Sequence, residues 1–407
     1  MAKRNNLNKV IFALTSILLF CNVFAENLDL ISDKYILYNL NDNKILMQKN
    51  ENEETQIASL TKIMTIIVAI ENITDFDEKV TITKDMVNNI EWDVAKIGLK
   101  SGDIVTYNDL LYGAMLPSAA DCVNALAISI SGNYKDFIEL MNNKVKELKL
   151  KHTHFENVVG LYSKDNYSSA YDVAEILKYS LKNQKFKQIF EAKEYVLTNG
   201  KKINSTLKTY NKKVGEDISY ITGAKTGYIK LAGNCLASTA TIDNVNYLLV
   251  TLNAYSNKKS PHILDATSTY KYFSNNYSYK YILKKNDVVV NLKTKYAKEK
   301  NIDIHSSQEY KYYLKNDFNK ESIKYEYDGI KEISYFTKKG TKLGKVKIKL
   351  NNEILETFEL IYNENLTFSI ASFLWINKAY VIAIILFIII LLKINKRKKR
   401  KKRVKVG

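Results

Sequence analysis

A hydroxyl and an amine stand three residues apart in the apolar stretch "IASLTKIMTIIVAI", residues 57–70. Ser59 opens the stretch and Lys62 lies inside it, with no acidic residue in the run. On a helix, residues i and i+3 share a face, so the two side chains can meet. Burial lowers the pKa of a lysine, and a neutral amine can take the proton of a serine hydroxyl. The pair predicts a serine nucleophile with a lysine base.

The position of Ser59 adds to this interpretation. We expect it in the first turn of a buried helix, where backbone N–H groups lack helical partners and the helix dipole is positive. Such an end helps to hold an oxyanion and disfavours protonation of a nearby amine. The S-x-x-K spacing alone is weak, because it recurs at three further places in this lysine-rich chain.

A second motif strengthens the prediction. "GAKTGYIKLAGNCL" places Lys225, Thr226 and Gly227 at the start of a predicted strand, where glycine permits close backbone approach. S-x-x-K, S-x-N and K-T-G together are a signature of penicillin-recognising serine enzymes. Ser118 occupies the first position of the middle motif, but Ala120 stands where that motif has asparagine.

With these motifs the chain resembles the low-molecular-mass penicillin-binding proteins, the serine-type D-alanyl-D-alanine carboxypeptidases of peptidase family S11. The resemblance covers residues 30–275, in the blocks "ASLTKIMT", "LLYGAMLPSAAD", "LKLKHTHFENVVGL", "YSSAYDVAEI" and "GAKTGYIKLAGNCL". It implies cleavage of the D-Ala-D-Ala end of peptidoglycan stem peptides through an acyl-enzyme. It also implies β-lactam antibiotics as covalent inhibitors, and neither a cofactor nor a metal.

The resemblance implies three catalytic residues. Ser59 is expected to attack the carbonyl between the two D-alanines. Lys62 is expected to accept the proton of that serine. Ser118 is expected to relay a proton to the leaving amine, assisted by Lys225.

The resemblance also implies how the substrate is held. The lysine and threonine of the segment Lys225, Thr226 and Gly227 are expected to bind the terminal carboxylate. The backbone N–H groups of Ser59 and Tyr228 are the expected oxyanion hole. No further cation for the carboxylate can be identified in the sequence.

Two alternatives remain open at this point. Because Ala120 replaces an amide, the protein could be a catalytically impaired homologue that binds penicillin or the cell wall. Asp121 could supply part of the lost polarity, although adjacent residues do not share a helix face. A class A β-lactamase requires a deacylating glutamate in an E-x-x-x-N context, and Glu156 in "HFENVVG" does not fit it.

The hydrophobic pattern predicts the fold that positions these residues. A strand and turn come first, several helices follow, and strand-like segments return at residues 234–255. We therefore expect an α/β, more narrowly α+β, transpeptidase/β-lactamase-like domain over residues 26–277, with an antiparallel sheet and a helical lobe. Short alternating segments predict a small all-β domain over residues 278–366.

The two ends of the chain predict export and anchoring. Residues 1–25 have the basic start, apolar stretch and small-residue end of a signal peptide. Residues 373–393 predict a transmembrane helix, because an apolar run of 18 residues is about the minimum length that spans a bilayer. By the positive-inside rule, the basic tail at residues 394–407 stays in the cytoplasm. The predicted location is the cell membrane, with a single span and the ectodomain outside.

The charge distribution excludes a nucleic-acid partner. The net charge is +18, but three cations lie in residues 1–25 and eleven in residues 369–407, which leaves +4 for the chain between. Cys122 and Cys235 remain after signal cleavage, and their apolar contexts favour buried free thiols over a disulfide. The four histidines have no metal-ligand spacing, so we expect no metal site.

Overall fold

The structure is a computed structural model of the 407-residue chain, and it describes residues 28–88, 90–215 and 217–403. The chain divides into two compact units, Met1–Asn275 and Asn276–Gly407. For comparison, the sequence placed the boundary between its two folded domains after residue 277. The predicted signal peptide, residues 1–25, lies outside the described residues.

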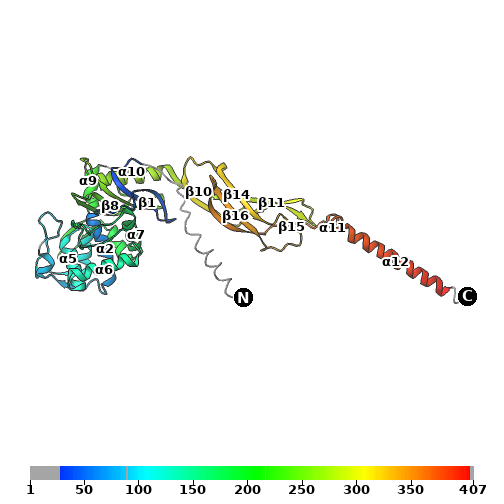
Figure 1. Cartoon of the computed structure of the whole chain (residues 1–407), viewed down its shortest axis with the longest axis horizontal. Helices are drawn as coiled ribbons and strands as arrows, with labels where there is room; N and C mark the ends of the chain where they lie inside the picture. The colour runs from blue at the N-terminus through cyan, green and yellow to red at the C-terminus, as the bar shows by residue number, and fades with distance from the viewer. Residues whose placement is uncertain (1–27, 89, 216, 404–407) are drawn as a thin grey trace. The chain divides into compact units, whose positions relative to one another are not determined.

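The first unit is built on one antiparallel sheet with the strand order β2-β1-β9-β8-β7 (Figure 1). An N-terminal hairpin therefore pairs with three strands that follow much later in the chain, as the sequence predicted. Strand β7 is an edge strand, with β8 on one side only. The strands are β1 (Ser32–Asn39), β2 (Lys44–Lys49), β7 (Ile221–Ile229), β8 (Gly233–Ile242) and β9 (Val245–Ala254).

The helical lobe lies between the two parts of the sheet in sequence. Its main helices match the predicted ones, including the break at Pro117 between α4 and α5. The helical elements of the first unit are η1 (Ala58–Leu60), α2 (Thr61–Asn72), α3 (Lys84–Val87), α4 (Tyr107–Met115), α5 (Ala120–Ser131), α6 (Tyr134–Glu147), α7 (Ala170–Ser180), α8 (Gln184–Glu191), α9 (Thr206–Val214) and α10 (Pro261–Asn276). Short two-stranded pairs complete it: β3 (Lys79–Thr81) with β4 (Ile104–Thr106), and β5 (Glu194–Val196) with β6 (Lys202–Asn204).

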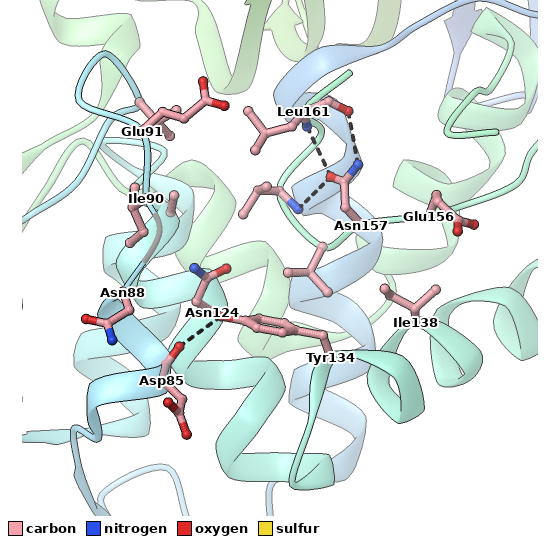
Figure 2. A pocket seen from close by; sticks show the side chains of 14 residues that line it. Asp85, Asn88, Ile90, Glu91, Asn124, Tyr134, Ile138, Glu156, Asn157 and Leu161 are labelled. Carbon is pink, nitrogen blue, oxygen red and sulfur yellow. Dashed lines mark hydrogen bonds between the residues drawn. The ribbon is translucent and has the colours of Figure 1, made fainter. Parts of the chain in front are cut away.

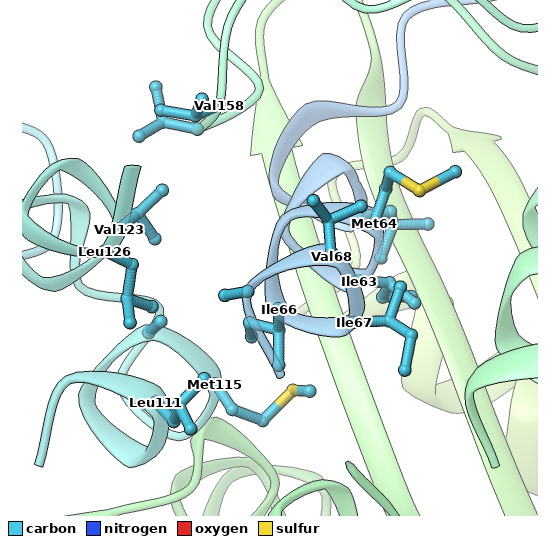
Figure 3. Close-up of a cluster of buried hydrophobic side chains, with 14 of the residues drawn as sticks. Ile63, Met64, Ile66, Ile67, Val68, Leu111, Met115, Val123, Leu126 and Val158 are labelled. Carbon is cyan, nitrogen blue, oxygen red and sulfur yellow. The ribbon is translucent and has the colours of Figure 1, made fainter. Parts of the chain in front are cut away.

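Helix α2 lies in the middle of the core. Every residue from Thr61 to Ile70 is buried, as expected for a helix that is apolar on all sides. Figure 3 shows side chains of α2, among them Ile66, opposite side chains of α4 and α5 such as Met115 and Leu126. Each buried aliphatic side chain of this kind stabilises the fold by roughly 1.5–3 kcal/mol. Helix α2, which carries Lys62, is therefore held firmly by the core.

The second unit contains the predicted β domain. Three small sheets have the orders β10-β13, β12-β11-β15 and β14-β16-β17. Its strands are β10 (Tyr277–Leu283), β11 (Val288–Lys295), β12 (Asn301–His305), β13 (Tyr310–Lys315), β14 (Ile323–Gly329), β15 (Glu332–Ser334), β16 (Lys342–Leu350) and β17 (Glu353–Ile361), with a 3₁₀ turn η2 (Lys320–Ser322).

Two helices follow the β domain, α11 (Ile370–Ile376) and α12 (Lys378–Arg403). Within the described residues, one segment, Lys378–Lys398, is long and apolar enough to cross a membrane, and none of it is buried. The predicted span, residues 373–393, overlaps this segment but starts earlier. The difference arises because Asn377 ends α11, so the long helix begins at Lys378.

Candidate active site

Ser59 and Lys62 lie in contact at the N-terminal end of the central helix. Ser59 belongs to the turn η1, and Lys62 is the second residue of α2. Lys62 Nζ lies 2.8 Å from Ser59 Oγ and donates a hydrogen bond to the carbonyl of Val159 at 2.7 Å. Only 2% of Lys62 is exposed. The amine therefore has one hydroxyl and one carbonyl as neighbours, and no carboxylate pairs with it in the described structure.

This environment favours the neutral form of Lys62, in which the amine can act as a base. Burial lowers its pKa from 10.5 to about 7, because the uncharged amine loses less solvation than the ammonium does. A neutral amine offers a lone pair to the hydroxyl of Ser59, which can then donate its proton as it attacks. The geometry and the electrostatics agree on the direction of proton transfer.

The local conformation at Ser59 differs from the predicted one. Ser59 lies in a 3₁₀ turn, and the α-helix begins only at Thr61. Ala58 has a left-handed backbone, with φ of 48°. A Cβ atom at Gly160 would lie 1.9 Å from the carbonyl oxygen of Ala58, so only glycine fits there. These tertiary contacts, which sequence spacing does not encode, surround the turn that presents Ser59.

Ser118 and Lys225 form a second pair of hydroxyl and amine. Lys225 Nζ donates to Ser118 Oγ at 2.8 Å and to the carbonyl of Thr226 at 2.9 Å. Burial, and secondly the charge of nearby Lys62, hold the pKa of Lys225 well below its usual range. Ser118 has φ of 64°, a strained conformation for a residue with a side chain. In this conformation its hydroxyl faces Lys225 on strand β7.

Strand β7 brings its glycine close to the backbone of Ser59. A Cβ atom at Gly227 would lie 2.9 Å from the backbone nitrogen of Ser59. The next residue, Tyr228, is 66% exposed. Because β7 is an edge strand, its outward-facing N–H and C=O groups have no partner within the sheet. They can pair with an extended peptide lying alongside Ser59.

Thr226 has a partner that the sequence did not reveal. Its hydroxyl donates to the hydroxyl of Thr206 at 3.2 Å. Thr206 is the first residue of α9, and the side chain of Ser205 caps that helix by accepting from the N–H of Leu207. The capping pattern of serine before a helix was the available signal, but the weak apolar pattern of this segment hid the helix.

A clamped loop supplies the carbonyl that Lys62 contacts. Asn157 Oδ1 accepts from the N–H groups of Val159, Gly160 and Leu161 at 3.3, 2.7 and 3.1 Å. Its amide donates to the carbonyl of Leu161 at 3.0 Å. One side chain therefore fixes the whole turn, and with it the position of the Val159 carbonyl. The sequence indicated this block only through its resemblance to the family.

The comparisons with known proteins agree with this geometry. The family described as D-alanyl-D-alanine carboxypeptidase, peptidase family S11, matches residues 22–256. The chain belongs to this family. The family described as penicillin-binding protein 5, C-terminal domain, matches residues 277–367.

Individual relatives of this S11 family member extend over both units. The D-alanyl-D-alanine carboxypeptidase DacF of Bacillus subtilis is 31% identical over 333 residues, which cover 79% of this chain and 82% of the relative. DacD of Escherichia coli is 29% identical, with coverage of 68% and 71%. The structure of penicillin-binding protein 6B from Escherichia coli matches 84% of this chain and 98% of its own, with a TM-score of 0.64 and 24% identity. The predicted family and fold class are confirmed.

In this S11 family member the middle motif departs from S-x-N as the sequence indicated. Ala120 is buried at the start of α5. The carboxylate of Asp121 accepts hydrogen bonds from the N–H groups of Ile97, Gly98 and Leu99 at 3.2, 2.7 and 2.9 Å. Asp121 therefore holds the neighbouring loop, and the idea that it replaces the missing amide is wrong.

The histidines and cysteines of this family member that could bind a metal or form a disulfide lie in structural positions. His154 sits in an isolated β-bridge with Tyr167, and His152 Nδ1 lies 3.3 Å from a carboxylate oxygen of Glu54. Cys122 in α5 and Cys235 in β8 are free, fully buried thiols. Burial raises the pKa of both, so neither is a nucleophile of this site.

Proposed function

We propose that this protein is a serine-type D-alanyl-D-alanine carboxypeptidase that removes the terminal D-alanine from peptidoglycan stem peptides, with Ser59 as the nucleophile. The family establishes the reaction class. The observation that supports the residue assignment is the buried pair in which Lys62 Nζ lies 2.8 Å from Ser59 Oγ, beside the open edge of β7.

Acylation follows from this arrangement. The stem peptide lies along β7, and Ser59 Oγ attacks the carbonyl carbon of the penultimate D-alanine while Lys62 takes the hydroxyl proton. The carbonyl oxygen becomes an oxyanion between the backbone N–H groups of Ser59 and Tyr228. Preorganised donors of this kind are usually the largest single contribution to such catalysis.

Collapse of the intermediate expels D-alanine. Ser118 gives its proton to the leaving amine and recovers one through Lys225, whose Nζ lies 2.8 Å from it. An ester on Ser59 remains. Lys62 then gives its proton, through solvent, to Lys225, which lost one to Ser118. As a neutral amine, Lys62 takes a proton from an incoming water while that water attacks the ester, and it returns this proton to Ser59 Oγ as the shortened stem leaves.

The hydroxyl of Thr226 and the ammonium of Lys225 bind the terminal carboxylate. Because burial disfavours the charged form of Lys225, the arrival of a carboxylate stabilises its protonated form. Substrate binding thereby places the proton where the departing amine needs it. To bind the carboxylate, the Thr226 hydroxyl turns its single proton away from the Thr206 hydroxyl, 3.2 Å away, and can then accept a hydrogen bond from it. A β-lactam, which carries an equivalent carboxylate, would acylate the same serine.

The protein is further proposed to act outside the cytoplasm. The apolar segment Lys378–Lys398 would span the membrane once, and the following lysines and arginines would stay in the cytoplasm. The signal sequence at residues 1–25 would be removed on export. Protease digestion of intact cells should then degrade the catalytic unit and spare the basic tail.

The decisive experiment uses the full-length protein in detergent micelles. Wild type is expected to release D-alanine from diacetyl-L-Lys-D-Ala-D-Ala and to bind a fluorescent penicillin covalently. The Ser59→Ala variant should lose both by at least ~10³-fold, since removal of a nucleophile removes the covalent pathway. A variant that still releases D-alanine at the wild-type rate would refute the assignment of Ser59. Rapid turnover of the penicillin would instead indicate a β-lactamase.

A further inference from the structure

A cavity of about 280 Å³ adjoins the catalytic residues. Two of its lining residues contact or neighbour them directly. Val159 receives the hydrogen bond of Lys62, and Ala120 lies two residues after Ser118. The opposite wall comes from Asp85 of α3 and from four residues that follow this helix, Asn88, Ile90, Glu91 and Val94. A cavity of this size accommodates part of a peptide substrate rather than a whole stem, since complete ligand pockets measure ~300–1,000 Å³.

Asn124 projects into this cavity from the wall formed by α5. Figure 2 shows its amide pointing toward the space between Ile90, Leu161 and Asn157. Among the residues that the structure describes, none forms a hydrogen bond with this amide. By contrast, the amide of Asn157 on the facing wall donates one hydrogen bond to its own loop and accepts others from it. Asn124 thus has hydrogen-bonding capacity that the described residues do not use.

The spacing of Asn124 from Ala120 indicates where the amide of Asn124 points. The two residues are four positions apart on α5, so they lie one turn apart on the same face. Helical side chains lean toward the N-terminus of their helix and cover the preceding turn. The amide of Asn124 therefore reaches toward the space that the methyl group of Ala120 leaves open, and both residues line the cavity.

We propose that Asn124 supplies the side-chain amide that Ala120 lacks, by hydrogen bonding a peptide group on the acyl side of the scissile bond within this cavity. An amide matches a peptide group because it both donates and accepts. The inference rests on the proposed carboxypeptidase function. It makes Asn124 a substrate-binding residue, contributed one helical turn later than the third position of the S-x-N motif.

The charged residues that line the cavity indicate which ligand groups it can bind. Asp85, Glu91 and Glu156 contribute carboxylates, and no lysine, arginine or histidine belongs to the lining. An anionic group would therefore bind unfavourably. Neutral amides and ammonium-bearing side chains of a stem peptide are the fitting ligands.

The test compares four variants of the full-length protein in detergent. Asn124→Ala is expected to lower kcat/KM for diacetyl-L-Lys-D-Ala-D-Ala about ten-fold, the effect of one lost hydrogen bond to substrate. The Ala120→Asn change made in the same chain should restore activity to within about three-fold of wild type, because the amide returns to the first turn. Ser129→Ala, which removes a hydroxyl further along the same helix, is the matched control and should act like wild type. Asn124→Asp keeps the size of the side chain but removes its donor, and should lose as much as Asn124→Ala.

The outcomes separate this inference from the function on which it rests. Restoration by Ala120→Asn supports it, since a purely structural role of Asn124 would not be rescued from another position. If Asn124→Ala matches wild type, or loses activity without rescue, the inference is overturned. If the double variant does not fold, Asn124→Asp decides, and wild-type activity of that variant overturns the inference. If wild type itself neither releases D-alanine nor binds fluorescent penicillin, the proposed function fails as well.

Discussion

Lysines have opposite environments in the catalytic unit and in the β domain. Lys62 and Lys225 are 2% and 0% exposed, and they contact hydroxyl and carbonyl oxygens. Lys295 in the β domain is paired with Glu332 at 2.6 Å, and about half of its side chain is exposed. Burial lowers the pKa of Lys62 to about 7, whereas the hydrogen bond that Lys295 donates to Glu332 raises the pKa of Lys295.

The two environments affect the stability of the fold differently. A buried amine without a carboxylate is destabilising, because the fold removes its solvation and returns only neutral hydrogen bonds. An exposed ion pair is nearly neutral for stability. The many buried aliphatic side chains around α2 offset the destabilisation at the site. The first unit thus contains two buried lysines that lower its stability, whereas Lys295 in the β domain has a carboxylate partner.

Among the changes considered, the replacement of Lys62 should have the largest effect, because it removes one of the two buried lysines. Lys62→Met is expected to slow acylation by fluorescent penicillin by ~10²–10⁴-fold, the usual contribution of a general base. The same change should raise the melting temperature, because an apolar side chain of similar volume replaces a poorly solvated amine. Calorimetry and stopped-flow acylation measure the two effects. A melting temperature below that of wild type would contradict the account of Lys62 as a destabilising residue.

Gly227→Ala probes the geometry of the site without changing its charges. The added Cβ would lie 2.9 Å from the Ser59 nitrogen and 3.1 Å from Ala58 Cβ, so the turn η1 must shift. A displacement of about 1 Å at a reacting group can cost ~10²-fold in rate. We expect a loss of that size in kcat/KM, with a melting temperature close to wild type. Ala232→Gly, a change away from the nucleophile, serves as a control for general loosening of the strands.

The pH dependence should sharpen the assignment of the base. Because Lys62 must be neutral, kcat/KM is expected to fall about ten-fold for each pH unit below about 7. Linkage predicts a matching trend in stability. Between pH 7 and 10.5 the unfolded chain binds the proton that folded Lys62 has released, so the free energy of unfolding should rise with pH across this window. Lys62→Met should reduce this rise, and the part that remains belongs to Lys225, whose pKa burial also holds well below its usual range. An unchanged slope would assign the whole rise to groups other than Lys62.

The smallest effect is expected in the β domain. Lys342 pairs with Glu359 across β16 and β17, and about half of each side chain is exposed. Lys342→Met should leave the melting temperature and D-alanine release unchanged within error, because exposed pairs contribute little. Thermal unfolding of the full-length protein checks this. A large decrease would show that surface pairs in the β domain carry more of its stability than the contrast assumes.

The sequence predicted those parts of the site that depend on periodicity and spacing. Ser59 and Lys62 meet because three residues make about one helical turn. The hairpin of β1 and β2 and the return of β8 and β9 follow from alternating apolar residues and turn signals. The sequence also showed that Ala120 occupies the position of asparagine in the middle motif.

Other features depend on contacts between distant segments, and spacing does not encode these. Ala58 and Ser118 have left-handed backbones, but neither is a glycine, so the sequence does not indicate these conformations. Ala58 lies against Gly160 and against Gly227 of β7, which are distant in sequence. Helix α9 was missed because "TLKTYNKKV" has few apolar residues. Asp121 was given the wrong role, since its side chain pairs with a loop more than twenty residues away.

The two buried cysteines give this protein a pair of internal reporters. Cys122 belongs to the helical lobe and Cys235 to the sheet, and neither thiol is accessible in the folded state. An alkylating reagent can reach each one only when its surroundings open. Separate modification rates, resolved by peptide mass, would therefore time the local opening of the lobe and of the sheet without any introduced label.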